Sequence, residues 1–185
     1  RLLMPQEFSS WSIINSMMYL LLLWIDGGLR KSIPRFAPMV SKHHLLQSIM
    51  PFYATILTLS APIFLYLVHA FHSHSWHLYA IITLLYITEG IHTSLRHLFH
   101  AYFLNKSFNL LSIKITTLEI LFTLICIPFF QHPLGLIFTI KLAGTSTLII
   151  TALMLLPSTT ELPSSTTINR KEFVIHTGAM WGLTI

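Results

Sequence analysis

The chain has 185 residues, of which 54% are hydrophobic and 9% are charged, whereas about 25% of the residues in a soluble domain are charged. A mean hydropathy of +0.69 and several apolar runs long enough to cross a bilayer indicate an all-α, polytopic membrane protein. The net charge of +5 comes from 11 basic and 6 acidic residues. Because the basic residues lie beside apolar runs, the sequence argues against nucleic-acid binding, and the single Cys126 excludes an internal disulfide or a thiolate metal cage.

The first apolar run, Trp11 to Ile25, predicts an N-terminal helix at the membrane surface. It has about 15 residues, fewer than the roughly 20 that a spanning helix needs, and Trp11 and Trp24 bracket it as interfacial aromatic residues do. Asp26-Gly27-Gly28 is expected to end this helix, and a short tilted transmembrane helix is the alternative. A basic connector follows, so residues 1–44 form the N-terminal unit.

Four further apolar runs predict a bundle of four transmembrane helices over residues 45–156. The expected spans are Leu45 to Leu67, Trp76 to Phe99, Leu110 to Phe130 and Leu134 to Leu156. Pro51 and Pro62 should kink the first span, and Pro128 should close the third. Residues 157–185 form a polar tail that is rich in Ser and Thr.

Lys and Arg mark one side of this four-span bundle. They occur before its first span, between its second and third spans and in the tail, and the other two loops have none. The positive-inside rule therefore places both ends of the bundle on the same, positive side. A composition rich in Leu, Ile, Thr, Ser and His is typical of organelle inner-membrane subunits, so we expect the mitochondrial inner membrane, with the positive side in the matrix.

The stretch Leu78 to Leu104, which contains most of the second span, carries Glu89, His92, Arg96, His97 and His100. At about 100° per residue, all but His97 fall within roughly 80° of one another, and His97 lies one step away. Ionisable groups at membrane depth are costly and usually face a protein interior, where they have a function. Arg96 and His100 either snorkel to the headgroups or line a polar pocket, and His97 is expected to be buried and hydrogen-bonded.

The deeper polar residues of the second span are expected to pair inside the bundle. For Glu89 we predict a structural ion pair with Arg96 or with Lys114. Lys114 is itself expected to be a buried polar residue. Proton transfer, quinone contact, and haem or lipid contact are the alternatives for Glu89 and His92.

Two further polar groups favour structural interpretations. Glu119 and Lys141, near mid-depth in the third and fourth spans, are expected to be buried and to pair with each other.

Four histidines occupy the loop after the first bundle span: His69, His72, His74 and His77. Because structural zinc sites usually recruit Cys or well-separated His pairs, a solvated loop is favoured over a metal site. The sequence predicts no catalytic residue and no metal ligand.

Three short motifs follow one another in an order that a known family shares. They are Ala37-Pro38, Ser48-Ile49, and Leu95-Arg96-His97-Leu98 followed by an aromatic residue. They resemble three motifs of the cytochrome b large membrane-anchor subunit of succinate dehydrogenase, respiratory complex II. In that family the first motif reads Ser-Pro-His-Leu, the second reads Ser-Ile-x-His-Arg, and the third reads Gly-Ile-Arg-His-Leu/Met.

The resemblance implies ubiquinone contacts from Ser48, Arg96 and His97. It also implies a haem b held by His92, with Arg96 and His97 at the propionates, although the family's haem histidine itself falls on Gly90. His69 and His92 are expected at different depths, about 24 Å apart along the membrane normal. A second haem ligand would therefore come from a partner subunit.

The leading hypothesis is a non-catalytic membrane-anchor subunit of mitochondrial succinate dehydrogenase. It would bind ubiquinone, a haem b shared with a partner subunit, and phospholipid or cardiolipin. Other subunits of the respiratory complex would be its partners, and a hydrophilic one would deliver the electrons, because this chain has no Fe–S or flavin motif. The alternatives are an accessory scaffold subunit of another respiratory complex, and a small membrane enzyme or proton carrier that uses Glu89 and His92.

Overall fold

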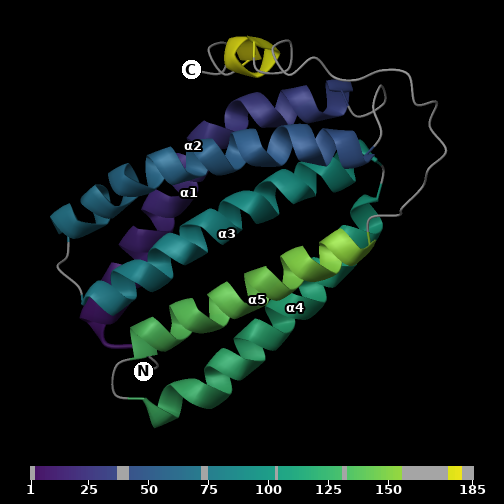
Figure 1. Cartoon of the computed structure of the whole chain (residues 1–185). Helices are drawn as coiled ribbons and strands as arrows, with labels where there is room; N and C mark the ends of the chain where they lie inside the picture. Colours follow the sequence, from purple (N-terminus) through teal and green to yellow (C-terminus); the bar gives the residue numbers. More distant parts are fainter. Residues whose placement is uncertain are drawn as a thin grey trace.

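The computed structural model describes residues 3–36, 42–71, 75–102, 104–130, 133–155 and 175–180. The long helices are α1 (Pro5–Phe36), α2 (Lys42–Phe71), α3 (Trp76–Ala101), α4 (Asn105–Cys126) and α5 (Pro133–Leu155). A 3-10 turn, η2 (Ile127–Phe129), continues α4 and contains Pro128, and residues 175–180 form a further helical segment. The described residues contain no strand, so the all-α prediction is confirmed (Figure 1).

All five long helices have the length and composition to cross a membrane. The four predicted bundle spans correspond to α2, α3, α4 and α5, and α1 adds a fifth candidate span. The chain is therefore a multi-span helical membrane protein.

The predicted end of the first helix at Asp26-Gly27-Gly28 is wrong. Helix α1 has 32 residues and runs through this sequence to Phe36, a length of about 48 Å against a hydrocarbon core of about 30 Å. Two glycines inside a helix cost about 1 kcal/mol each. Tertiary packing outweighs this cost, because α1 packs against α2 and α3 and its residues Ile25, Asp26 and Gly28 are buried there.

Helix α3 is the centre of the bundle. It packs against α1, α2, α4 and α5, whereas α4 packs mainly against α5. Figure 1 shows α2 on one side of α3 and the α4–α5 pair on the other. Side chains of α3 therefore meet residues from every other long helix.

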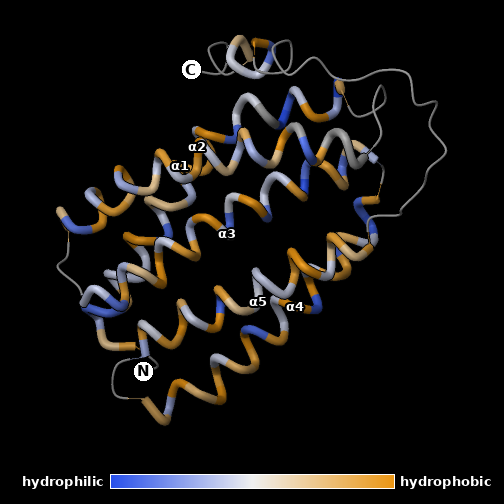
Figure 2. The backbone as a smooth tube through the Cα atoms, in the orientation of Figure 1, coloured by the Kyte–Doolittle hydropathy of each residue, from blue (hydrophilic) through white to orange (hydrophobic). Residues whose placement is uncertain are grey.

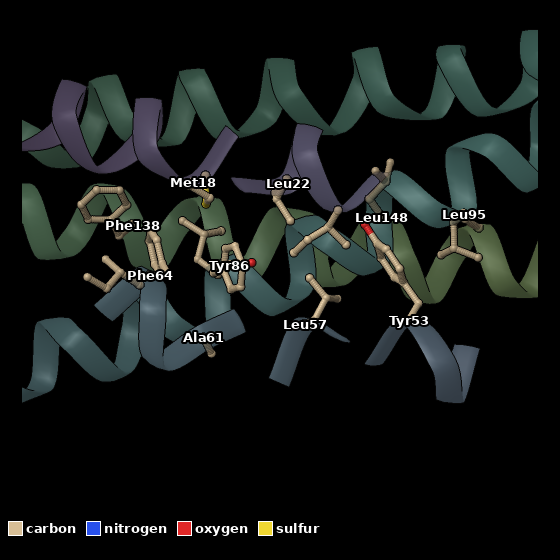
Figure 3. Close-up of a cluster of buried hydrophobic side chains, with 14 of the residues drawn as sticks. Met18, Leu22, Tyr53, Leu57, Ala61, Phe64, Tyr86, Leu95, Phe138 and Leu148 are labelled. Carbon is tan, nitrogen blue, oxygen red and sulfur yellow. The ribbon is translucent and has the colours of Figure 1, made fainter. Parts of the chain in front are cut away.

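Large apolar side chains fill the space between the helices (Figure 3). The ring of Phe64 on α2 stacks on that of Tyr86 on α3, with centroids 4.7 Å apart and planes at 15°. The Tyr86 hydroxyl lies 2.6 Å from the Ser60 hydroxyl. A stacked pair and a buried hydrogen bond thus fix the α2–α3 register.

Helix α4 consists largely of apolar residues (Figure 2), and many of its large apolar side chains are exposed. Its exposed large side chains include Ile113, Leu118, Ile120, Leu121, Phe122 and Ile125. An apolar surface of this size on a long helix fits lipid tails or other transmembrane helices.

If α1 crosses the membrane, its N-terminal end lies on the side opposite to the basic residues. We predict that cysteines introduced at Met4, which is exposed, and at Lys31 react with an impermeant maleimide from opposite sides of sealed vesicles. Lys106→Cys should label from the same side as Lys31→Cys, and Cys126→Ser removes the background. Labelling of Met4→Cys and Lys31→Cys from one side would show that α1 lies on the surface.

Gly90 allows α2 and α3 to approach closely. A Cβ at this position would lie 2.5 Å from a terminal methyl of Leu57, so we predict that Gly90→Val lowers the stability in detergent by about 1–3 kcal/mol. Leu57→Ala should relieve the clash in the double variant. Gly135→Val is the control, because a Cβ at Gly135 meets nothing within 4 Å. Equal losses in both valine variants would contradict this packing.

Candidate functional site

Glu89 is buried on α3 and receives three polar contacts. Its Oε1 accepts a hydrogen bond from the Thr145 hydroxyl at 3.2 Å and lies 3.5 Å from Lys141 Nζ. Its Oε2 lies 3.5 Å from His92 Nδ1. The expected partners of Glu89, which were Arg96 or Lys114, are wrong, because the ion pair is made with Lys141 of α5.

Lys141 joins three helices. Besides its contact with Glu89, its Nζ donates hydrogen bonds to Asn15 Oδ1 at 3.2 Å and to the Tyr19 hydroxyl at 3.0 Å, both on α1. The ammonium also lies 5.0 Å from the centre of the Tyr19 ring. One lysine thus satisfies polar groups of α1 and α3 from its place on α5.

Glu119 of α4 is half-buried and lies beside this ion pair. Its carboxylate occupies the space that a side chain at Gly144 would need, and it interacts electrostatically with Glu89, Lys141 and His92. The ion pair of Glu119 with Lys141 that the sequence predicts is not formed in the described structure, where Lys141 pairs with Glu89. We call Glu89, His92, Glu119 and Lys141 the central charge cluster.

Lys114 is exposed, which corrects its prediction as a buried residue. It precedes Glu119 by five positions, which places the two side chains about 140° apart around α4. Since Glu119 faces α5, Lys114 points away from that contact and towards the membrane or a partner.

A second polar contact joins α3 and α1. His97 Nε2 lies 2.8 Å from Asp26 Oδ2, and the two side chains are 14% and 10% exposed. The Tyr53 hydroxyl and Asp26 Oδ1 are buried without a hydrogen-bond partner among the described residues, and Tyr53 interacts electrostatically with Asp26. These three residues form a buried polar cluster, which we name the Asp26–His97 pocket.

Sequence reasoning missed Asp26 and Tyr53 as members of this pocket. Asp26 was read as a helix terminator beside two glycines, and a buried Tyr on an apolar helix gives no local signal. The apolar residues on both sides of Asp26-Gly27-Gly28 could have indicated a continuous helix, in which a lone acid needs a partner.

The polar face predicted on α3 is divided in the structure. Glu89 and His97 are turned into the bundle, whereas Arg96 and His100 are exposed near the C-terminal end of α3. A guanidinium at this depth is solvated by headgroups without being buried. Of the three predicted quinone contacts, only His97 is therefore part of the Asp26–His97 pocket. Ser48 lies on α2, but its side chain is outside the described part of the structure, as are Ala37-Pro38.

Two of the histidines predicted in the loop lie in helices, His69 in the last turn of α2 and His77 in the first turn of α3, and neither belongs to a metal centre within the described residues. His69 Nδ1 bonds the Tyr79 hydroxyl at 2.8 Å, and His77 packs on Trp76 with ring centroids 3.7 Å apart. His72 and His74 lie outside the described residues. Within the described ranges no group of three or more His, Cys, Asp or Glu could hold a metal ion.

The surroundings of His92 do not fit a haem in this chain alone. Its ring stacks on Phe108 with centroids 5.6 Å apart, and its Nδ1 faces Glu89. Its Nε2 is buried and has no partner among the described residues, so an iron could reach this nitrogen only if the side chains packed around it moved. A Cβ at position 90, where the haem ligand of the resembling family falls, would lie 2.5 Å from a methyl of Leu57, so a side chain there requires Leu57 to move.

An apolar groove of about 370 Å³ lies between α1 and α2. It is lined by Trp24, Ile25, Gly28, Phe52, Ile56, Leu59, Ser60, Ile63, Thr177 and Gly178. Ile25 and Phe52 are the sequence neighbours of Asp26 and Tyr53, so the groove and the Asp26–His97 pocket share the same turns of α1 and α2.

The helical segment 175–180 closes one part of this groove. Thr177 donates a hydrogen bond to the Ser32 hydroxyl at 3.1 Å, and Ser32 also lies 3.1 Å from His176 Nδ1. The His176 ring packs edge-on against Phe36, with centroids 5.5 Å apart. These contacts attach the segment to the C-terminal turns of α1.

Comparisons with known proteins identify no relative. No protein-family model matches the chain, and searches of curated proteins and of solved structures find no match. The function must therefore be inferred from the two polar sites and the groove.

We predict that His97→Leu lowers the free energy of unfolding by about 3 kcal/mol, because it leaves Asp26 buried without its partner. The double variant Asp26→Leu/His97→Leu should recover most of this loss, since it buries no unpaired charge. Thermal unfolding in detergent measures both. The control is His100→Leu on the exposed side of α3, which should change stability by less than about 0.5 kcal/mol. Equal losses of stability in His97→Leu and His100→Leu would refute a structural Asp26–His97 bond.

Proposed function

We propose that this chain is a membrane-anchor subunit of a respiratory complex of the succinate dehydrogenase type, and that it helps to bind ubiquinone. The observation that carries the proposal is the juxtaposition of the Asp26–His97 pocket with the apolar groove between α1 and α2. A quinone combines two carbonyl acceptors with an apolar tail, and it needs a few polar groups within an otherwise apolar site. The Tyr53 hydroxyl would donate to a carbonyl, and the groove would hold the tail.

The position of these residues along the helices also supports a quinone site. The groove and the pocket lie in the half of α1 that leads to the basic residues Arg30, Lys31 and Arg35. In the proposed topology this side faces the matrix. A hydrophilic partner bound there would deliver the electrons, while Asp26 and His97 are titratable groups next to the site where a quinone would take up protons.

Haem b is not assigned to this chain alone. The motif resemblance implies a haem near His92, and such a haem would need its second ligand, and most of its pocket, from a partner subunit. Phospholipid or cardiolipin is the second expected ligand, because the groove is apolar and opens beside basic residues. We place the complex in the mitochondrial inner membrane, following the composition.

A non-catalytic scaffold in another respiratory complex is the second candidate. The exposed apolar surface of α4 favours it, since this helix packs mainly against α5 and leaves room for transmembrane helices of neighbouring subunits.

Purification from the native membrane in mild detergent separates the two candidates. A flavoprotein and an iron–sulfur protein that co-purify with the chain would support the anchor, and a reduced-minus-oxidised spectrum would report any b-type haem. A different set of respiratory subunits would leave the scaffold function.

Within such a complex, we predict that Tyr53→Phe weakens ubiquinone binding roughly tenfold, as expected for one lost hydrogen bond of about 1.4 kcal/mol. The subunits should stay assembled, because Tyr53 makes no hydrogen bond to the described residues that the change could break. The measurement is the KM for a soluble ubiquinone analogue.

The matched control is Tyr66→Phe, on the same helix but 73% exposed, which should leave the KM unchanged.

Arg96→Ala tests the residue taken from the motif, and it should lower quinone reduction in an assembled complex. Loss of assembly in Arg96→Ala and an unchanged KM in Tyr53→Phe would together favour the scaffold.

A further inference from the structure

The quinone proposal makes no use of the central charge cluster, which is the most costly feature of the bundle. Glu89, Glu119 and Lys141 lie within the apolar spans α3, α4 and α5. The positive charge of Lys141 is shared by two carboxylates, because it forms the ion pair with Glu89 and interacts electrostatically with Glu119.

Counting charges shows that the central charge cluster is unbalanced. With both glutamates ionised, Lys141 charged and His92 neutral, the four side chains carry one net negative charge. Among the described residues, the other polar groups that contact the cluster are Asn15 and Tyr19 of α1 and Thr145 of α5, and none of these three supplies a positive charge. An uncompensated charge in a low-dielectric interior is unfavourable, so the binding of one proton stabilises the cluster.

The hydrogen bonds indicate which carboxylate accepts this proton. Glu89 receives a hydrogen bond from Thr145 and has Lys141 and His92 within 3.5 Å, so its ionised form is stabilised. Glu119 accepts no hydrogen bond from the described residues and packs against Gly144, a residue without a side chain to donate one. Glu119 is also only half-buried, so it is not sealed from the surroundings of the bundle.

We propose that the central charge cluster is a proton-exchange site within the membrane, which takes up and releases one proton at Glu119. The step converts the Glu119 carboxylate and one proton into a neutral carboxylic acid, and it involves no electron transfer. His92, whose Nε2 is buried and unpartnered among the described residues, stands beside Glu89 as a second group that can hold the proton. This inference does not depend on the quinone site or on the identity of the complex.

Infrared difference spectroscopy of the full chain in phosphatidylcholine nanodiscs tests the proposal, because the chain has only 6 acidic residues. During a pH titration, above about pH 5.5, where exposed carboxyl groups are ionised, the C=O stretch of one protonated carboxyl group should appear in the unmodified chain and be lost in Glu119→Gln. Glu7→Gln, which changes an acid near the start of α1, should keep the band. A band that persists in Glu119→Gln, or one that is lost in Glu7→Gln, would overturn the proposal.

A second variant tests the charge balance and does not depend on the folding of the first. Lys141→Gln removes the cation that stabilises both carboxylates, so the midpoint of the band should move to higher pH by about one unit or more. If Glu119→Gln fails to fold, Glu119→Asp should keep a carboxyl band with a displaced midpoint. An unchanged midpoint in Lys141→Gln would show that the cluster is a structural contact without an exchangeable proton.

Discussion

The ion pair between Lys141 and Glu89 is the contact on which the arrangement of the bundle depends. Apolar helices in a bilayer gain little from burying apolar surface against one another, because lipid tails are equally apolar, so polar contacts and close packing decide which helices associate. Lys141 connects α5 with α3 through Glu89 and with α1 through Asn15 and Tyr19. Since α4 packs mainly on α5, the position of both helices follows from this lysine.

The Asp26–His97 bond has the same role at the other polar site. It links α1 to the central helix two turns beyond Glu89, about 12 Å along α3 at 1.5 Å per residue. An acid in the middle of a long apolar helix is tolerated because a histidine faces it. Helix α1 also continues through two glycines, which have a low helix propensity. Packing of α1 against α2 and α3, including the Asp26–His97 bond, stabilises the helix at this point.

Both polar sites therefore involve α3, and each contains at least one acid and a histidine. A structural bundle would need only enough polarity to fix the helix order, and the central charge cluster exceeds that need by one negative charge. The Asp26–His97 pocket likewise has buried polar atoms without partners among the described residues, on Tyr53 and Asp26. Unsatisfied buried polar atoms in a membrane protein are expensive, which is why we connect both sites with ligands, a quinone in one case and a proton in the other.

The sequence by itself determined the class of protein and the positions of the four spans from α2 to α5, because composition and apolar run length are local properties. It also marked α3 as the helix with the ionisable residues. Only the tertiary structure decided the partners, which are Lys141 for Glu89 and Asp26 for His97. It also decided which side chains are buried, since Lys114 is exposed and Glu119 is half-buried on the same helix. Pairing depends on which helices become neighbours and how each is rotated. These are long-range properties that spacing along one helix does not contain, and the length of α1 was misjudged for the same reason.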